Sequence, residues 1–118
     1  MLLTPKTVEA AYVFLCATPP FSAWKMPCVE EMRFRVMKSH RVQAWFQVCG
    51  RGPDRERILA VSVNCIGHTN SLVGAVAHEM VHVYMDAHGL DTAGEHTKTF
   101  YKLAKRVCKI HGFDPKTF

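Results

Sequence analysis

Hydrophobic positions near the N-terminus repeat at the spacing of a helix. Thr4 is suited to cap that helix and Pro5 to its first turn. Four apolar residues then recur three or four positions apart and share one face: Val8, Ala11, Tyr12 and Leu15. Pro19 and Pro20 stop the pattern, because the residue before a proline disfavours helical geometry. The sequence therefore predicts an amphipathic helix at the start of the chain.

Three later segments have the residue patterns of β-strands. Apolar residues alternate with arginines from Met32 to Val36, and with glutamines and Trp45 from Val42 to Val48. The segment from Ile58 to Cys65 is rich in β-branched residues. Short connections join the three, one of them formed by the turn residues 50–54. This arrangement predicts an antiparallel or mixed sheet of three strands.

Two further helices follow the strands. One is predicted from Leu72 to His88, capped by Thr69, Asn70 or Ser71 and ended by Gly89. The last is predicted from His96 to Ile110 and ends at Gly112. The order of one helix, three strands and two helices predicts an α+β domain.

Length and composition agree with one globular domain over residues 1–118. No apolar run approaches the roughly 20 residues of a membrane span. The start lacks the features of a secretory signal, and the cysteines are odd in number and form no C-x-x-C pair. A reducing compartment fits this usage, so we expect a cytoplasmic, monomeric protein that does not enter a membrane.

The chain carries a formal net charge of +5, and its basic residues fall in two groups. Seven lie from residue 32 to 57 and six from residue 96 onward: Arg33, Arg35, Lys38, Arg41, Arg51, Arg55 and Arg57, then Lys98, Lys102, Lys105, Arg106, Lys109 and Lys116. Acidic partners such as DNA are compatible with this distribution. A solvated surface with no such partner is the alternative interpretation.

The predicted helix from Leu72 to His88 contains the pattern H-E-x-x-H, formed by His78, Glu79 and His82. Residues four apart on a helix lie on one face, so both imidazoles can reach one metal ion. Neutral imidazole nitrogens suit zinc. Glu79 is placed to act as the general base for a water activated by that zinc. The helix is apolar on most sides, where three such polar residues are costly to bury without a shared partner.

A catalytic zinc site needs a third protein ligand and one open position. His88 has the spacing found in metzincins, but Met85 stands where that pattern needs a glycine, and no methionine follows it. We therefore reject His88 as a ligand. Glu95 would complete a His-His-Glu site and His96 a three-histidine site. The residues alone leave both alternatives open.

The segments His78–Tyr84 and Gly94–Phe100 together resemble the SprT family, which includes the Spartan proteases. Members carry H-E-[LM]-x-H and, further along, a histidine followed four residues later by an aromatic residue, as His96 is followed by Phe100. The resemblance covers about Ile58 to Phe113. It implies a zincin-like fold with His78, His82 and His96 as metal ligands and Glu79 as the catalytic base. The chain departs from the family at Thr97, where glycine is common.

By this resemblance the chain is a zinc-dependent endopeptidase that acts on a protein or peptide, with DNA-associated proteins as one candidate class of substrate. The resemblance also implies that an extended substrate pairs with a sheet-edge strand beside the cleft. The alternative is a non-enzymatic nucleic-acid- or protein-binding module in which zinc is structural.

Several other side chains are candidates for supporting roles. A second donor to the oxyanion is expected from Tyr84, Tyr101 or His111. Asp86, Asp91 and Glu95 are close enough in sequence to accept a hydrogen bond from a metal-bound histidine. For each of these six residues, simple packing or solvation is the alternative.

Overall fold

The computed structural model describes residues 2–66, 68–90 and 95–118. It has an α+β architecture of three helices and a three-stranded mixed sheet, as the sequence predicts. The elements are α1 (Pro5–Cys16), β1 (Met32–Met37), β2 (Ala44–Cys49), β3 (Glu56–Ser62), α2 (Thr69–Ala87) and α3 (Lys98–His111). Short 3₁₀ helices lie at Phe21–Ala23, Val29–Glu31 and Gly52–Asp54.

Helix α1 begins where its polar residues predict. The Thr4 side chain accepts a hydrogen bond from the Thr7 backbone, and the Thr7 hydroxyl accepts one from the Thr4 backbone. This reciprocal pair satisfies amides that would otherwise lack partners in the first turn. The four apolar residues of the predicted face are buried: Val8, Ala11, Tyr12 and Leu15. The predicted helix is therefore confirmed together with its cap.

The sheet places its last strand in the middle. The order is β1-β3-β2, with β1 parallel and β2 antiparallel to β3. Residues from Ile58 to Ser62 in β3 are buried, which fits a strand flanked on both sides. The sequence predicts an antiparallel or mixed sheet, and the mixed form is the one observed. The strands β1 and β2 are consequently the two edges of this sheet.

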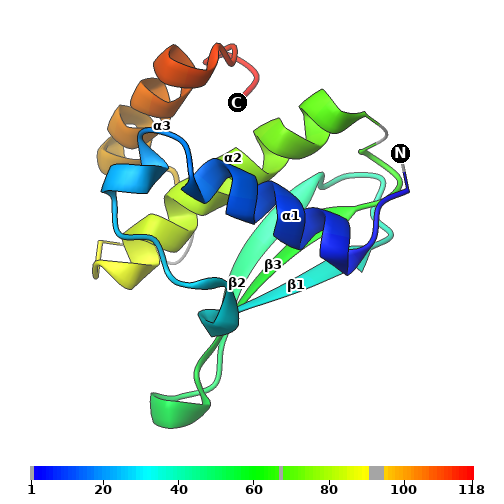
Figure 1. Ribbon diagram of the computed structural model, residues 1–118, viewed down its shortest axis with the longest axis vertical. Coiled ribbons are helices and arrows are strands. Elements are labelled where there is room, and N and C mark those ends of the chain that lie inside the picture. Colours follow the sequence, from blue (N-terminus) through cyan, green and yellow to red (C-terminus); the bar gives the residue numbers. More distant parts are fainter. Residues whose placement is uncertain (1, 67, 91–94) are drawn as a thin grey trace.

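Helices α1 and α2 cover one face of the sheet, and α3 packs against α2 (Figure 1). One hydrophobic cluster joins the helices to the strands; among its fully buried members are Leu15, Leu59, Val81 and Val107. Helix α2 therefore lies between the sheet and α3. Side chains on different sides of α2 can meet either β2 or α3. In the part of the chain described, no helix is both long and apolar enough to cross a membrane.

The element ends differ from the sequence predictions by a few residues. Helix α2 starts at Thr69 after His68, whose side chain makes no capping hydrogen bond. Helix α3 starts at Lys98, because the Thr97 side chain accepts a hydrogen bond from the Phe100 amide. Strand β3 ends at Ser62, where the hydroxyl donates to the Ser39 carbonyl at 2.6 Å. As a result His96 precedes α3 instead of starting it.

Asp86 fixes the C-terminal end of α2 to the start of β3. One of its carboxylate oxygens meets Arg57 Nε at 2.9 Å and the other meets Arg55, and its side chain is only 9% exposed. The sequence suggests Asp86 as a hydrogen-bond partner for a metal-binding histidine. The structure instead engages both carboxylate oxygens with arginines. Asp86 therefore has a structural role.

Replacing Asp86 with alanine is expected to lower the free energy of unfolding by about 2 kcal/mol, because it leaves Arg57 largely buried without its partner. The matched control is Glu56→Ala, which removes the exposed ion pair with Arg33 (3.7 Å). That change is expected to cost about 0.5 kcal/mol or less. Urea unfolding of the two variants checks the prediction, and equal losses would contradict it.

Candidate metal centre and cleft

Three histidines come together between α2 and the start of α3. The ring centroids of His78, His82 and His96 form a nearly equilateral triangle with sides of 5.4, 5.1 and 5.1 Å. One potential ligand atom from each ring lies within 4.8 Å of the other two. A tetrahedral ion with metal–nitrogen bonds of about 2.0–2.1 Å holds its ligand atoms about 3.4 Å apart. Small ring movements would therefore bring the three nitrogens onto one metal ion.

Phe100 forms a platform beneath the three rings. Its ring stacks on His96 at 4.3 Å and on His82 at 4.5 Å, and lies 5.1 Å from His78. Phe100 is on the first turn of α3 and is 2% exposed. Helix α3 thus holds an aromatic surface against the ligands that α2 supplies. The sequence shows Phe100 as an aromatic residue four positions after His96 but does not indicate that its ring stacks on the histidines.

The environment keeps the histidines of α2 neutral. Burial, together with the neighbouring histidines, lowers the pKa of His78 to about 4, although a hydrogen bond to the Phe118 backbone opposes this. Burial and His96 likewise lower the pKa of His82 to about 4. Neutral imidazoles are the form that binds metal ions. Within the described residues, His82 Nδ1 is buried without a hydrogen-bond partner. A bound cation is one way to offset that cost.

Glu79 is buried on α2 and its carboxyl group reaches the edge strand β2. The residue is 7% exposed, and burial raises its pKa to about 7. A hydrogen bond from the Phe46 backbone opposes that rise. The Ser62 amide donates to the Gln43 carbonyl at 2.7 Å, so the alternation of an antiparallel pair points the Phe46 amide away from β3. The carboxyl group therefore meets the free edge of β2.

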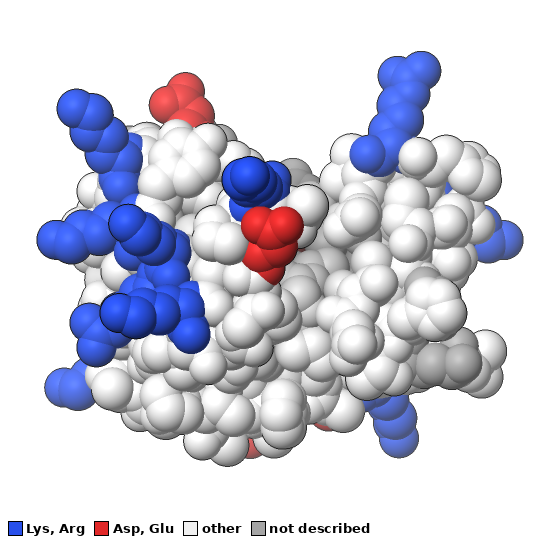
Figure 2. Space-filling model, turned by 90° about the horizontal axis from the view of Figure 1, so that it is seen from above, with Lys and Arg blue, Asp and Glu red and all other residues white. Residues whose placement is uncertain are grey.

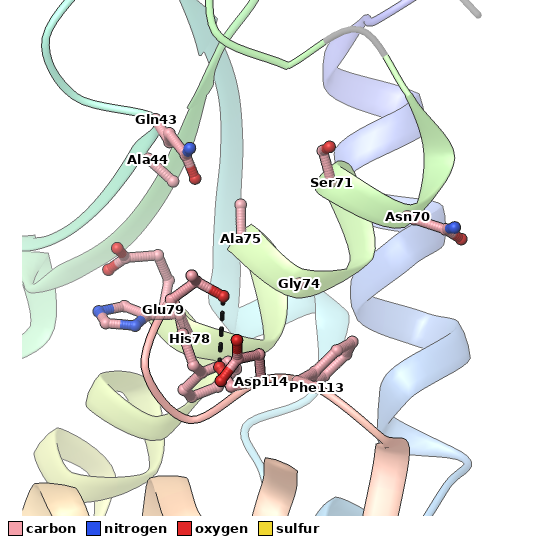
Figure 3. A pocket seen from close by; sticks show the side chains of 12 residues that line it. Gln43, Ala44, Asn70, Ser71, Gly74, Ala75, His78, Glu79, Phe113 and Asp114 are labelled. Carbon is pink, nitrogen blue, oxygen red and sulfur yellow. Dashed lines mark hydrogen bonds between the residues drawn. The ribbon is translucent and has the colours of Figure 1, made fainter.

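A cleft of about 430 Å³ opens beside Glu79 and His78. Figure 3 shows its parts: Gln43 and Ala44 at the β2 side, Gly74 and Ala75 on α2, and the chain after α3. Gly112 ends α3 with φ of +80° and turns the chain back toward α2. The ring of Phe118 then lies 5.3 Å from that of His78. Residues 113–118, the C-terminal turn, thus form one wall of the cleft. No pattern in the sequence predicts this contact.

The structure shows which candidate for the third ligand lies beside His78 and His82. His96 joins His78 and His82. His88 Nε2 contacts the Trp24 carbonyl oxygen at 3.1 Å, and its ring packs on Tyr84, away from the triangle. Glu95 is exposed and belongs to no metal-binding group that the described residues form. Asp91 and Gly94, the other residues considered near this site, lie outside the described residues.

The three candidates for donating a hydrogen bond to the oxyanion also lie at different distances from the histidines. Tyr84 packs on Trp24, with ring centroids 4.7 Å apart. His111 Nε2 pairs with the Thr18 hydroxyl at 3.2 Å and the ring stacks on Phe113. Only Tyr101 of the three packs on a histidine of the triangle, 6.1 Å from His96, and it is 60% exposed. Tyr101 is therefore the one candidate placed near the histidines.

The pKa shifts predict how acid affects the metal-free protein. The pKa values of His78 and His82 fall from 6.5 to about 4 on folding, so the unfolded chain binds more protons between these values. The two histidines therefore destabilise the fold as the pH drops through this window. Glu79 acts in the opposite direction, because its pKa rises from 4.5 to about 7. Because the two histidines outweigh the single glutamate, we expect the free energy of unfolding of the metal-free protein to decrease as the pH falls from 6.5 to 4.5.

The variant Glu79→Gln tests the sign of these contributions. It removes the group that gains protons on folding, so acid should destabilise the metal-free variant more than the metal-free wild type. Urea midpoints at pH 6.5 and 4.5, in the presence of a chelator, measure both slopes. A slope no steeper in the variant would contradict the raised pKa of Glu79.

Comparison of the chain with known proteins found no matching family model, no matching curated protein and no matching solved structure. Any functional assignment therefore depends on the residues of the site itself.

Proposed function

We propose that the chain is a zinc-dependent endopeptidase with a zincin-like domain. The observation that carries this proposal is the triangle of His78, His82 and His96 with the Glu79 carboxyl group beside it in an open cleft. Three histidines with one position left for substrate are a common catalytic zinc site. The resemblance of the same residues to the SprT family supports the proposal further.

The donor set fits zinc. Imidazole nitrogen is among the preferred zinc ligands, and the lowered pKa values keep His78 and His82 ready to bind at neutral pH. When bound, zinc supplies a Lewis acid that polarises the scissile carbonyl group and acidifies water. His78 and His82 would hold the ion from one face of α2, and His96 would supply the third ligand from the segment before α3.

Glu79 moves the proton in this mechanism. Its carboxylate accepts a proton from the attacking water as the new carbon–oxygen bond forms, and it later donates that proton to the leaving amine nitrogen as the carbon–nitrogen bond breaks. A pKa raised to about 7 by burial is suited to both steps near neutral pH. The Phe46 amide orients the carboxyl group from the β2 edge.

The edge of β2 gives an extended substrate a place to bind. The amide and carbonyl groups of Ala44 and Phe46 face away from β3, since Gln43 pairs with Ser62 and the pattern alternates. The Phe46 amide is engaged by Glu79, so a peptide added as a further strand would hydrogen-bond to the Ala44 amide and to the two carbonyl groups and run past Glu79. This placement supports an endopeptidase, because such a strand can continue on both sides of the scissile bond.

A structural zinc site is less compatible with these features. Structural sites are closed by four protein ligands. Among the described residues the only group able to hold a metal has three members, and His96 is exposed. A buried carboxyl group beside the histidines has no use in a structural site. The non-enzymatic alternative therefore leaves the buried carboxyl group of Glu79 unexplained.

The charge of α3 favours DNA as a second class of partner. Figure 2 shows lysine and arginine side chains gathered at the side of the molecule where α3 lies in Figure 1. The residues are all exposed: Lys98, Lys102, Lys105, Arg106 and Lys109. Such a face can bind phosphates without reading sequence. Affinity for duplex DNA that weakens steeply with salt would support this partner.

The peptidase proposal is tested on an unfolded protein such as casein. The zinc-loaded chain should produce new termini that mass spectrometry locates within the substrate. Cleavage should stop with a chelator and return with added zinc. Cleavage that persists after complete removal of metal would contradict the proposal.

A further inference from the structure

We propose that the cleft beside Glu79 contains a subsite for a large apolar side chain of the peptide substrate, bounded by Gly74 and Ala75 below and by Phe113 and Phe118 at one side. The inference deepens the proposed peptidase function and rests on it. It assigns a substrate class to the space between α2 and the C-terminal turn.

The floor of the subsite is made by small residues of α2. Ser71, Gly74 and Ala75 lie three or four positions apart and continue into His78 and Glu79, so they share one face of the helix. From Asn70 to Glu79 this face is about 13 Å long. A Cβ atom added at Gly74 would have no neighbour within 4 Å. The space above the floor is therefore open to a substrate side chain.

The wall of the subsite is aromatic and is held in place. Phe113 and Phe118 stack with ring centroids 5.6 Å apart, and both pack against the hydrophobic core. Asp114 holds the turn between them: its carbonyl oxygen accepts the Thr117 and Phe118 amides at 3.1 and 3.0 Å. Its carboxylate oxygen accepts the Lys116 amide at 2.9 Å. The turn is therefore a preformed part of the cleft.

The charges of the lining disfavour an acidic side chain, and its two aromatic rings favour an apolar one. Four neutral polar residues complete the lining: Gln43, Asn70, Ser71 and Thr117. Apart from His78, a proposed metal ligand, and Glu79, the proposed base, the only ionisable lining residue is Asp114. An acidic substrate side chain would meet carboxylates of the same sign, and no lining lysine or arginine would balance it. The aromatic wall beside the small residues of the floor instead offers apolar area to a phenylalanine or leucine side chain. The subsite ends at Glu79, so that side chain belongs to a residue next to the scissile bond.

Peptide binding tests this subsite separately from hydrolysis. The zinc-loaded Glu79→Gln chain, which should not cleave, is titrated into fluorescein-labelled hexapeptides with phenylalanine, leucine, alanine, lysine or glutamate at the fourth position and alanine elsewhere. Fluorescence anisotropy gives each affinity. Burial of a phenylalanine or leucine side chain should strengthen binding about tenfold or more over alanine. Equal affinities, or tightest binding of the lysine or glutamate peptide, would overturn the proposal.

Two substitutions at one position locate the subsite. Gly74→Leu fills the open space and should weaken binding of the phenylalanine peptide about tenfold. Its matched control, Gly74→Ala, should stay within about threefold of the parent. Both replacements favour a helix over glycine, so the fold is expected to persist. Zinc content and urea unfolding verify that. A well-folded Gly74→Leu chain that binds as tightly as the parent would overturn the location.

The failures of the two proposals are distinguishable. If wild type cleaves no protein while the hexapeptides still show the apolar preference, the peptidase function fails and the subsite stands. If wild type cleaves proteins but the hexapeptides bind alike, the subsite fails and the peptidase function stands. A third variant, Phe118→Ala, should reduce the apolar preference by removing part of the wall, and an unchanged preference would exclude Phe118 from it.

Discussion

Replacing Glu79 with glutamine is expected to abolish peptide hydrolysis while leaving zinc bound. Glutamine keeps the size of the side chain but cannot take a proton from water, so the general base is lost. Such a base typically contributes about 10²–10⁴-fold to the rate. We expect kcat/KM for an internally quenched peptide to fall by about 10³-fold or more, with close to one zinc ion still present per chain.

Glu95→Gln is the matched control. Glu95 directly precedes His96 in the sequence but is exposed and belongs to no metal-binding group of the described residues. Its replacement should change kcat/KM less than about twofold, since an exposed charge is screened by water. Full activity of Glu79→Gln would refute the mechanism. An equal loss in both variants would point to a general electrostatic effect of the carboxylates.

The local elements of the fold could be predicted because neighbouring residues specify them. Thr4 and Pro5 mark the start of α1, and the alternation around Phe34 marks β1. The order of the strands could not be predicted in the same way. Strands β2 and β3 are neighbours in sequence, but the parallel pairing of β3 with β1 joins segments on either side of β2, such as Met32 with Arg57. Periodicity identifies a strand but carries no information about its partners.

The ends of the elements were harder to predict for a similar reason. The Thr97 side chain caps α3, and threonine is a residue type that often caps helices. The apolar pattern of the helix is, however, equally compatible with a start at His96. The end of β3 depends on Ser62, whose hydroxyl bonds to Ser39 from the β1–β2 connection. Competing hydrogen-bond partners of this kind exist only once the chain has folded.

The residues of the candidate site likewise differ in whether the sequence can predict them. His78, Glu79 and His82 could be identified together because four residues span about one turn of a helix. The residues alone left His96 and Glu95 as alternatives and only the family resemblance favoured His96, whereas the fold places the His96 ring 5.1 Å from each of the other two rings. The Phe46 amide, which orients Glu79, carries no sequence signal, because every residue other than proline has one.

Replacing His96 with alanine is expected to remove nearly all of the bound zinc. His96→Ala deletes one of three ligands, and the other two lie on a single helix face, where they cannot surround an ion. Loss of a mere hydrogen-bond partner to a ligand typically costs about 10- to 100-fold in metal affinity. Loss of the ligand itself should exceed that. Zinc per chain, measured by elemental analysis after dialysis, should fall from about one to near zero.

His88→Ala is the control that makes this result specific. His88 directly follows α2 and has the alternative ligand spacing, but it contacts the Trp24 carbonyl and packs on Tyr84. Its removal should leave the zinc content unchanged. Loss of zinc from His88→Ala and not from His96→Ala would overturn the three-histidine site. Because the measurement needs no substrate, it tests the metal centre even before a cleavable protein is known.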